Sequence, residues 1–232
     1  FMIGILGGMG TQAGLDFCNK LAVINRGKID QNYPLFMLYN KSNIPNRPQN
    51  LKKYQNVLNS LVNGCKLLER NKCKFIVMPC NTAHYWYDDL KKKIKIPILS
   101  MPKEVFIHTK KLCKKKSKIG LLGTEATLKT GIYGKYFTKD YNLVTPDKIL
   151  QKKNVNKAIK LVKMGKVKKA EKILRPAVNY LVKKKCKKII LGCTELPVAI
   201  FAYKSFKKIK ESKIFIDPNL LLAQVSMKKY RM

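Results

Sequence analysis

Two cysteines stand in similar surroundings in the two halves of this chain. Cys80 lies in the stretch IVMPCNTAH (residues 76–84), and Cys193 lies in IILGCTE (residues 189–195). Each cysteine ends an apolar run and is followed by small polar residues of the kind that begin helices. A thiol beside the unpaired N–H groups of a helix start has a stabilised thiolate and a lowered pKa. We therefore expect Cys80 and Cys193 to be reactive.

Two opposed thiols are suited to moving a proton. A base that removes a proton from one face of a carbon, with an acid that returns one to the other face, inverts the configuration of that carbon. A carbanion beside a carboxylate also needs hydrogen-bond donors aimed at that carboxylate. Helix N-termini could supply these donors, together with the hydroxyl groups of Thr82, Thr124, Thr127 and Thr194. The residues therefore predict an enzyme that inverts the configuration of a carbon atom by proton transfer.

The elements that would position the thiols follow an α/β pattern. Apolar runs at 2–8, 35–40, 75–79 and 96–101 predict buried parallel strands, with helices near 12–26, 50–70 and 82–93. The second half repeats this order with KIGLLGT (118–124), KCKKIILGC (185–193) and KIFIDP (213–218). We interpret this as two homologous halves, each with an open parallel sheet. The alternative is that buried strands of any α/β protein look alike.

The expected sheets also predict where a ligand binds. In open parallel sheets, ligands lie beyond the carboxyl ends of the strands, which is where Cys80 and Cys193 occur. Two halves related by approximate twofold symmetry would place these thiols on opposite sides of one cleft.

The charge of the chain is strongly positive, with 49 Lys and Arg against 13 Asp and Glu and a formal net charge of +36. The lysines form short runs along the whole chain, without one basic tail or an aromatic-interleaved strip for stacking bases. We therefore expect no specific nucleic-acid partner, although nonspecific binding to polyanions and attraction of a small anionic substrate follow from the charge.

The cysteine and histidine content argues against disulfides and zinc. Seven cysteines are an odd number, no C-x-x-C occurs, and His84 and His108 are the two histidines. No apolar stretch approaches the ~20 residues of a membrane span, and nothing reads as a secretory signal. We expect a cytoplasmic protein without a membrane partner or a metal.

A glycine-rich turn follows the first expected strand. The stretch from Gly8 to Ala13 fits the dinucleotide fingerprint, but that fingerprint requires an acidic residue at the end of the second strand. The second strand ends in Tyr39-Asn40-Lys41-Ser42 without an acid. We interpret the glycines as allowing close approach of the backbone to a small substrate, and a nicotinamide enzyme as the weaker alternative.

The motifs of the chain resemble those of the aspartate racemases, within the aspartate/glutamate racemase superfamily. The resemblance covers essentially the whole chain and rests on ILGGMGTQAG (5–14), PNR (45–47), PCNTAH (79–84), GLLGTEATLKTGIY (120–133) and LGCTELP (191–197). It implies a cofactor-independent homodimeric enzyme with two pseudosymmetric, Rossmann-like α/β domains and the active site in the cleft between them. One domain would hold residues 1–101 plus about 210–232, and the other residues 102–209.

Three places distinguish branches of this superfamily. Glutamate racemases usually carry an Asp-Ser pair after the first strand and a His after the second Cys-Thr. This chain has Gly7-Gly8-Met9-Gly10 and Glu195 there, as aspartate racemases do. Some broad-specificity racemases replace the first cysteine by threonine, whereas this chain keeps Cys80.

The resemblance also implies roles for individual residues. Arg47 matches an arginine whose planar guanidinium binds the side-chain carboxylate of the substrate, and Lys163 is a looser match to a lysine with the same role. The α-carboxylate and amino group would be held by Asn81, Thr82, Thr124 and Thr194. Met9 and Gly10 lie in the turn that approaches the substrate.

Two further residues are expected to support the cysteines. Glu195 would orient or electrostatically tune Cys193, or favour the helix start. His84 is expected to support the helix start after Cys80 rather than to act as a base.

The predicted function is interconversion of L- and D-aspartate by a two-cysteine, two-base proton transfer at Cα. One methylene changes apolar binding by only ~1 to 3 kcal/mol, so glutamate remains open as a substrate. The alternatives are a broad-specificity amino-acid racemase or a small dicarboxylate isomerase of the same superfamily. An alternative of another class is a non-catalytic polyanion-binding protein.

Overall fold

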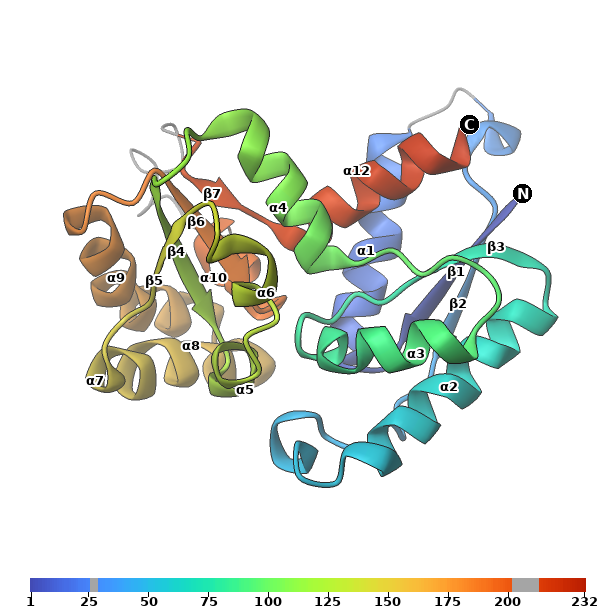
Figure 1. Cartoon of the computed structure of the whole chain (residues 1–232), viewed down its shortest axis with the longest axis horizontal. Coiled ribbons are helices and arrows are strands. Elements are labelled where there is room, and N and C mark those ends of the chain that lie inside the picture. The colour runs from blue at the N-terminus through green and yellow to red at the C-terminus, as the bar shows by residue number, and fades with distance from the viewer. Residues whose placement is uncertain (26–28, 202–212) are drawn as a thin grey trace. The chain divides into compact units, whose positions relative to one another are not determined.

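The computed structural model describes residues 1–25, 29–201 and 213–232 (Figure 1). These residues form two compact units, one of Phe1–Glu104 with Asn219–Met232 and one of Val105–Pro218. Each unit contains one parallel sheet. The helix end expected at residue 26 and the domain boundary expected near residue 210 lie outside the described residues.

The first unit has a three-stranded sheet in the order β2-β1-β3, with β1 (Met2–Gly7) in the centre between β2 (Phe36–Asn40) and β3 (Cys73–Val77). Helices cover both faces of this sheet. Figure 1 shows α12, from the end of the chain, beside α1 from its beginning, and the Asn219 side chain donates to the Ala13 carbonyl there. The helical elements are α1 (Thr11–Ile24), η1 (Asp30–Asn32), η2 (Pro48–Asn50), α2 (Tyr54–Arg70), η3 (Thr82–Trp86), α3 (Tyr87–Lys93), the start of α4 (Met101–Leu112) and α12 (Pro218–Tyr230).

Side chains of the first sheet alternate between two cores, because neighbouring residues of a strand point to opposite faces. Ile5 and Val77 pack in a cluster that contains residues of α1 and α12. Leu6 and Ile76 pack in the cluster that contains residues of α2. Burial on both faces explains why these strands are apolar throughout.

The second unit has a four-stranded sheet in the order β5-β4-β6-β7. Its strands are β4 (Lys118–Gly123), β5 (Asn142–Val144), β6 (Lys188–Gly192) and β7 (Phe215–Ile216). The central strand β4 is thus flanked as β1 is in the first unit. The helical elements are α5 (Glu125–Lys129), α6 (Gly134–Phe137), α7 (Lys148–Leu150), a π-helical turn (Gln151–Asn156), α8 (Lys157–Lys163), α9 (Val167–Lys183) and α10 (Glu195–Phe201).

The two parallel sheets confirm the predicted fold class, with two local corrections. The run 96–101, predicted as a strand, makes a single bridge from Ile98 to Ile76. A strand cannot extend there because Pro97 has no N–H to pair and α4 begins at Met101. The helix predicted over 82–93 begins as the 3₁₀ turn η3 and becomes α-helical at Tyr87.

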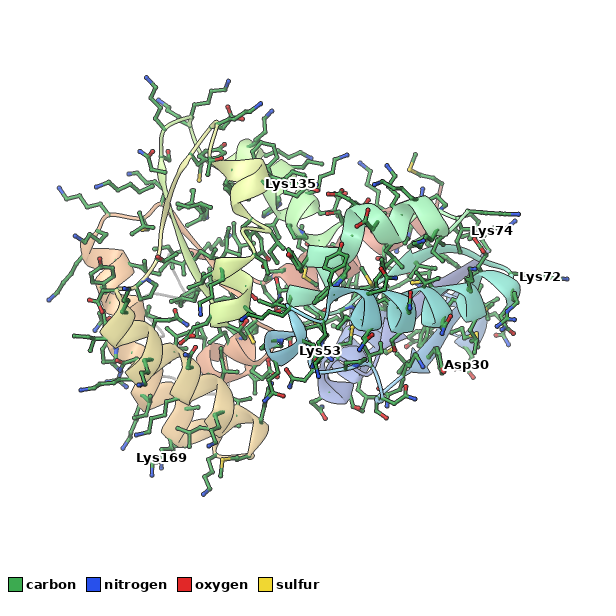
Figure 2. All side chains as sticks on the ribbon, turned by 60° about the horizontal axis from the view of Figure 1, so that its bottom comes forward. Asp30, Lys53, Lys72, Lys74, Lys135 and Lys169 are labelled. Atoms are coloured by element: carbon green, nitrogen blue, oxygen red, sulfur yellow. The ribbon has the colours of Figure 1, made fainter. Side chains whose placement is uncertain are left out.

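Basic side chains occur on both units. Figure 2 labels Lys53, Lys72, Lys74, Lys135 and Lys169, which lie at separate places along the two units, and nitrogen-tipped side chains extend outward around each unit. The positive charge is therefore spread out, as the short lysine runs of the sequence indicated. Within the described ranges, no helix is long and apolar enough to cross a membrane.

Candidate active site

The cysteine of the second unit leaves its sheet beside a threonine. Gly123 of β4 pairs with Gly192 of β6, so the residues that follow, Thr124 and Cys193, leave neighbouring strands at the same edge. A Cβ atom on Gly192 would lie 2.9 Å from the Leu122 carbonyl oxygen, so the two strand ends approach closely only because Gly192 has no side chain.

Cys193 is buried and contacts a carboxylate. Its Sγ donates to Glu195 Oε2 at 2.9 Å, and the Thr194 hydroxyl donates to the same oxygen at 3.2 Å. The other oxygen, Glu195 Oε1, lies 3.6 Å from Lys163 Nζ at the end of α8. The second unit therefore brings together four residues that were predicted from the sequence: Cys193, Thr194, Glu195 and Lys163.

The environment of Cys193 corrects the expected direction of its pKa. Burial, followed by the charge and hydrogen bond of the Glu195 carboxylate, raises the pKa of the Cys193 thiol well above its ordinary value. The Glu195 backbone N–H and the Lys163 ammonium act in the opposite direction but are outweighed. The helix start does favour the thiolate, but desolvation and a neighbouring anion disfavour it more. Burial and the Glu195 carboxylate thus favour the thiol over the thiolate at Cys193.

Thr124 is fixed by the helix that it begins. It is the N-cap of α5, where its Oγ1 accepts the Thr127 N–H at 3.1 Å and lies 3.0 Å from Thr127 Oγ1. Thr127 is 1% exposed, so its hydroxyl lies behind Thr124 and helps to orient it. The half-buried Thr124 is the more accessible of the two hydroxyls.

The cysteine of the first unit is positioned by a tight turn. Cys80 is buried three residues after the end of β3, and its N–H donates to the Met78 carbonyl at 2.7 Å. Asn81 and Thr82 are also buried and begin the 3₁₀ turn η3. Unlike Cys193, Cys80 is followed by an amide and a hydroxyl, with no carboxylate at the second position.

His84 links the backbone of Cys80 to the start of α4. Its Nε2 accepts the Met101 N–H at 3.1 Å, so the ring proton must be on Nδ1, which donates to the Cys80 carbonyl at 2.9 Å. Burial lowers the pKa of His84, since the charged ring would be poorly solvated. A neutral ring with both nitrogens engaged is suited to orienting Cys80 and not to carrying protons.

Arg47 lies in the loop after β2, at the same edge of the first sheet. Its Nη1 donates to the carbonyls of Ile44 and Pro45, each at 3.2 Å. Its Nε is buried and has no hydrogen-bond partner among the described residues. Ile44 shares a buried cluster with Met9 and Cys80, so this loop packs near the predicted cysteine.

The glycine turn after β1 packs against the same loop. Gly8 has a φ of +87°, and a Cβ atom there would lie 2.2 Å from the Lys41 carbonyl carbon, so only glycine fits. Gly10 is the N-cap of α1 and has open space where a side chain would be. Gly8 is therefore required by the packing of this turn, whereas Gly10 is not.

Three functional candidates were missed by sequence reasoning. Tyr133 is fully buried, and burial, with the nearby Asp217 and Cys193, raises its pKa. Gln151 and Asn156, in the π-helical turn, hydrogen-bond the residues that flank Thr124. Their only signal in the sequence is two amides in a lysine-rich helix, which does not reveal their partners.

The His, Cys, Asp and Glu side chains of the described residues were compared with the ligand sets that bind metal ions. Among residues 1–25, 29–201 and 213–232, no group of three His, Cys, Asp or Glu side chains lies where it could hold a metal ion.

The fold of this chain is similar to that of solved racemases. The two parallel α/β sheets, one in each compact unit, match the fold of solved aspartate racemases and their homologues. An aspartate racemase homologue from Pyrococcus horikoshii superposes with a TM-score of 0.81 at 26% identity, covering 100% of this chain and 99% of the other. The Picrophilus torridus aspartate racemase gives a TM-score of 0.78 at 32% identity, covering 99% and 97%.

The family model for Asp/Glu/hydantoin racemases matches residues 6–225, and the chain belongs to this family. A broad-specificity amino-acid racemase from Bacillus subtilis is 31% identical over 143 residues, which are 58% of this chain and 59% of that protein. The resemblance recognised in the sequence motifs is confirmed, and the isomerase class is confirmed at the level of the family.

Proposed function

We propose that the protein is a cofactor-independent aspartate racemase in which Cys80 and Cys193 act on opposite faces of the substrate Cα. One observation carries the proposal: equivalent strands of the two sheets, β3 and β6, are each followed by a buried cysteine at the edge where such sheets bind ligands. The similarity to the Picrophilus torridus aspartate racemase over almost the whole chain supports aspartate as the substrate.

In the proposed reaction each unit supplies one thiol. When the Cα proton faces Cys80, the Cys80 thiolate removes it, and the Cys193 thiol donates its own proton to the opposite face. The contact of Cys193 with Glu195 supports its role as the resting acid, because both burial and the carboxylate favour the protonated thiol. The reverse reaction exchanges the two roles.

Substrate binding is assigned to polar groups at both sheet edges. The Thr124 hydroxyl and the N–H groups at the starts of η3 and α10 would stabilise the α-carboxylate, where charge develops as the proton leaves. Arg47 would bind the side-chain carboxylate. Its buried Nε has no hydrogen-bond partner among the described residues, and a guanidinium group can donate two parallel hydrogen bonds to a carboxylate. The Lys163 ammonium, whose side chain is 61% exposed, has further donors besides the one facing Glu195 and would add to the attraction.

The test is to incubate the protein with L-aspartate in D₂O without added cofactor, while Cα–H loss and optical rotation are followed. Deuterium should enter Cα as the rotation decays to zero. Cys80→Ser and Cys193→Ser should each abolish racemisation. Cys73→Ser and Cys186→Ser are the matched controls and should retain turnover. They alter buried cysteines at the opposite ends of the same two strands, since Cys73 begins β3 and Cys186 lies just before β6. Unchanged turnover in either of the first two variants would refute the two-base mechanism.

A broad-specificity racemase is the second candidate, favoured by the 31% identity to the Bacillus subtilis protein. A panel of amino acids in the same assay separates the two. If the Cα protons of neutral amino acids exchange as fast as that of aspartate, the protein is a broad-specificity racemase and not an aspartate racemase.

A further inference from the structure

The helix that leads to Lys163 contains a π-helical turn. Helix α7, the turn Gln151–Asn156 and α8 follow one another with helical backbone angles at each junction. A π turn pairs residues five apart, is rare, and often occurs at functional sites. Gln151 and Asn156 are five residues apart, and Gln151 Nε2 donates to Asn156 Oδ1 at 2.8 Å.

These two amides hold both neighbours of Thr124. Gln151 Nε2 also donates to the Gly123 carbonyl at 2.9 Å. Asn156 Nδ2 donates to Glu125 Oε1 at 2.7 Å. The chain of hydrogen bonds therefore runs from the carboxylate after Thr124, through both amides, to the carbonyl before Thr124.

The orientation of this chain is fixed by its two ends. Both ends are acceptors, the Glu125 carboxylate and the Gly123 carbonyl, so each amide must present its NH₂ group as observed. Gln151 is 6% exposed, and its Oε1 has no partner among the described residues. A buried acceptor without a partner lowers stability, so Gln151 is better explained by the two bonds that it donates than by packing.

We propose that Gln151 and Asn156 are positioning residues that hold Thr124 at the carboxyl end of β4, in line with Cys193. The inference rests on the proposed function, in which the Thr124 hydroxyl binds the substrate α-carboxylate. Because Gly123 pairs with Gly192, a shift of the Gly123 carbonyl would move Thr124 relative to Cys193. Loss of either amide should therefore weaken substrate binding and misplace the carbanion-stabilising donor.

The kinetic test uses Gln151→Leu and Asn156→Leu, with Asn154→Leu as the matched control. Asn154 lies in the same π turn and is half-buried like Asn156, but its Nδ2 donates at 2.7 Å to the Ile173 carbonyl of α9, away from Thr124. Each of the first two variants should raise the KM for aspartate about tenfold and lower kcat by less, whereas Asn154→Leu should leave both within about twofold. Equal kinetic effects of all three variants would overturn the proposal.

A double-mutant cycle separates positioning from general loss of stability. In a Thr124→Ala background, Gln151→Leu should change kcat/KM by less than about twofold, because the residue it positions is gone. A full additional loss would show that Gln151 acts elsewhere.

Hydrogen exchange provides a readout that needs no turnover. Gln151→Leu and Asn156→Leu should speed exchange of the Thr127 N–H, which Thr124 Oγ1 accepts, while Asn154→Leu should not. If the wild type racemises no amino acid, the proposed function fails while this measurement still decides the positioning. Unchanged exchange in both variants would refute the positioning itself.

Discussion

Cys193 donates to Glu195 Oε2 at 2.9 Å, while the other oxygen of that carboxylate lies 3.6 Å from Lys163 Nζ. Glu195 thus lies between a thiol that donates a hydrogen bond to it and the ammonium group of Lys163. The residue two positions after Cys80 is Thr82, a hydroxyl, so the two cysteines have chemically different neighbours. Substitution of Glu195 is therefore expected to change the chemistry of the Cys193 thiol.

Glu195→Gln should make the Cys193 thiolate form at lower pH. Burial is the largest cause of the raised pKa and remains in the variant, but the charge of the carboxylate is removed. The pKa of Cys193 should therefore fall towards its ordinary value without reaching it. The measurement is the rate of alkylation of Cys193 against pH in a Cys80→Ser background, followed by mass spectrometry of its peptide. If the dependence of the alkylation rate on pH is the same in the variant as in the wild type, Glu195 does not affect the pKa of Cys193.

Lys163→Gln should have the opposite effect in the same alkylation assay. The ammonium lowers the pKa of Cys193, so its removal should move the alkylation profile to higher pH. Lys160→Gln is the matched control, since Lys160 is an exposed lysine of the same helix, and its profile should match the wild type. Identical profiles for both lysine variants would exclude a specific role of Lys163.

Arg47→Lys should weaken binding of aspartate selectively. A lysine retains the charge but cannot make the planar bidentate pair with a carboxylate, so the KM for aspartate should rise about tenfold or more. Exchange of alanine, which has no side-chain carboxylate, should change little. Arg70→Lys, at the exposed end of α2, serves as the control. An equal loss for aspartate and alanine would assign Arg47 a structural role.

His84→Gln should alter how stability depends on pH. The folded pKa of His84 is lowered, so the unfolded chain binds the proton first, and stability is lost as pH falls below about 6.5. The linkage amounts to at most about 1.4 kcal/mol per pH unit. At pH 8 the variant should be less stable by about 1 to 3 kcal/mol, because the Met101 N–H and Cys80 carbonyl lose their shared partner.

The stability difference between wild type and His84→Gln should shrink as the pH falls from 7 to 5. Urea unfolding of both proteins across this range measures it. A constant difference would mean that His84 is protonated to the same extent in the folded and unfolded states.

The positions of the two cysteines could be predicted from the sequence because a buried strand followed by a helix start has a clear pattern. The parallel sheets were predicted from the same pattern, whereas the strand order and the pairing of Gly123 with Gly192 became known only from the structure. The raised pKa of Cys193 could not be predicted, because the sequence shows a helix start but not the burial of the thiol or the direction of the Glu195 side chain.

Contacts between residues far apart in the sequence could not be predicted either. The tautomer of His84 depends on the Met101 N–H, and the role of Gln151 depends on the Gly123 carbonyl. Both are long-range pairs without a local signal. The three-residue strand β5 was missed because its half-buried residues are too few to show an alternation.

The π turn has a consequence for the direction in which Lys163 points. Each residue turns an α-helix by about 100°, but a π turn, which pairs residues five apart, turns the chain by less at each residue. The wider turn therefore takes up one extra residue without rotating α8, and Lys163 keeps the direction that an uninterrupted helix one residue shorter would give it. Deletion of the exposed Lys152 should let the segment return to α-geometry with Lys163 still directed towards Glu195.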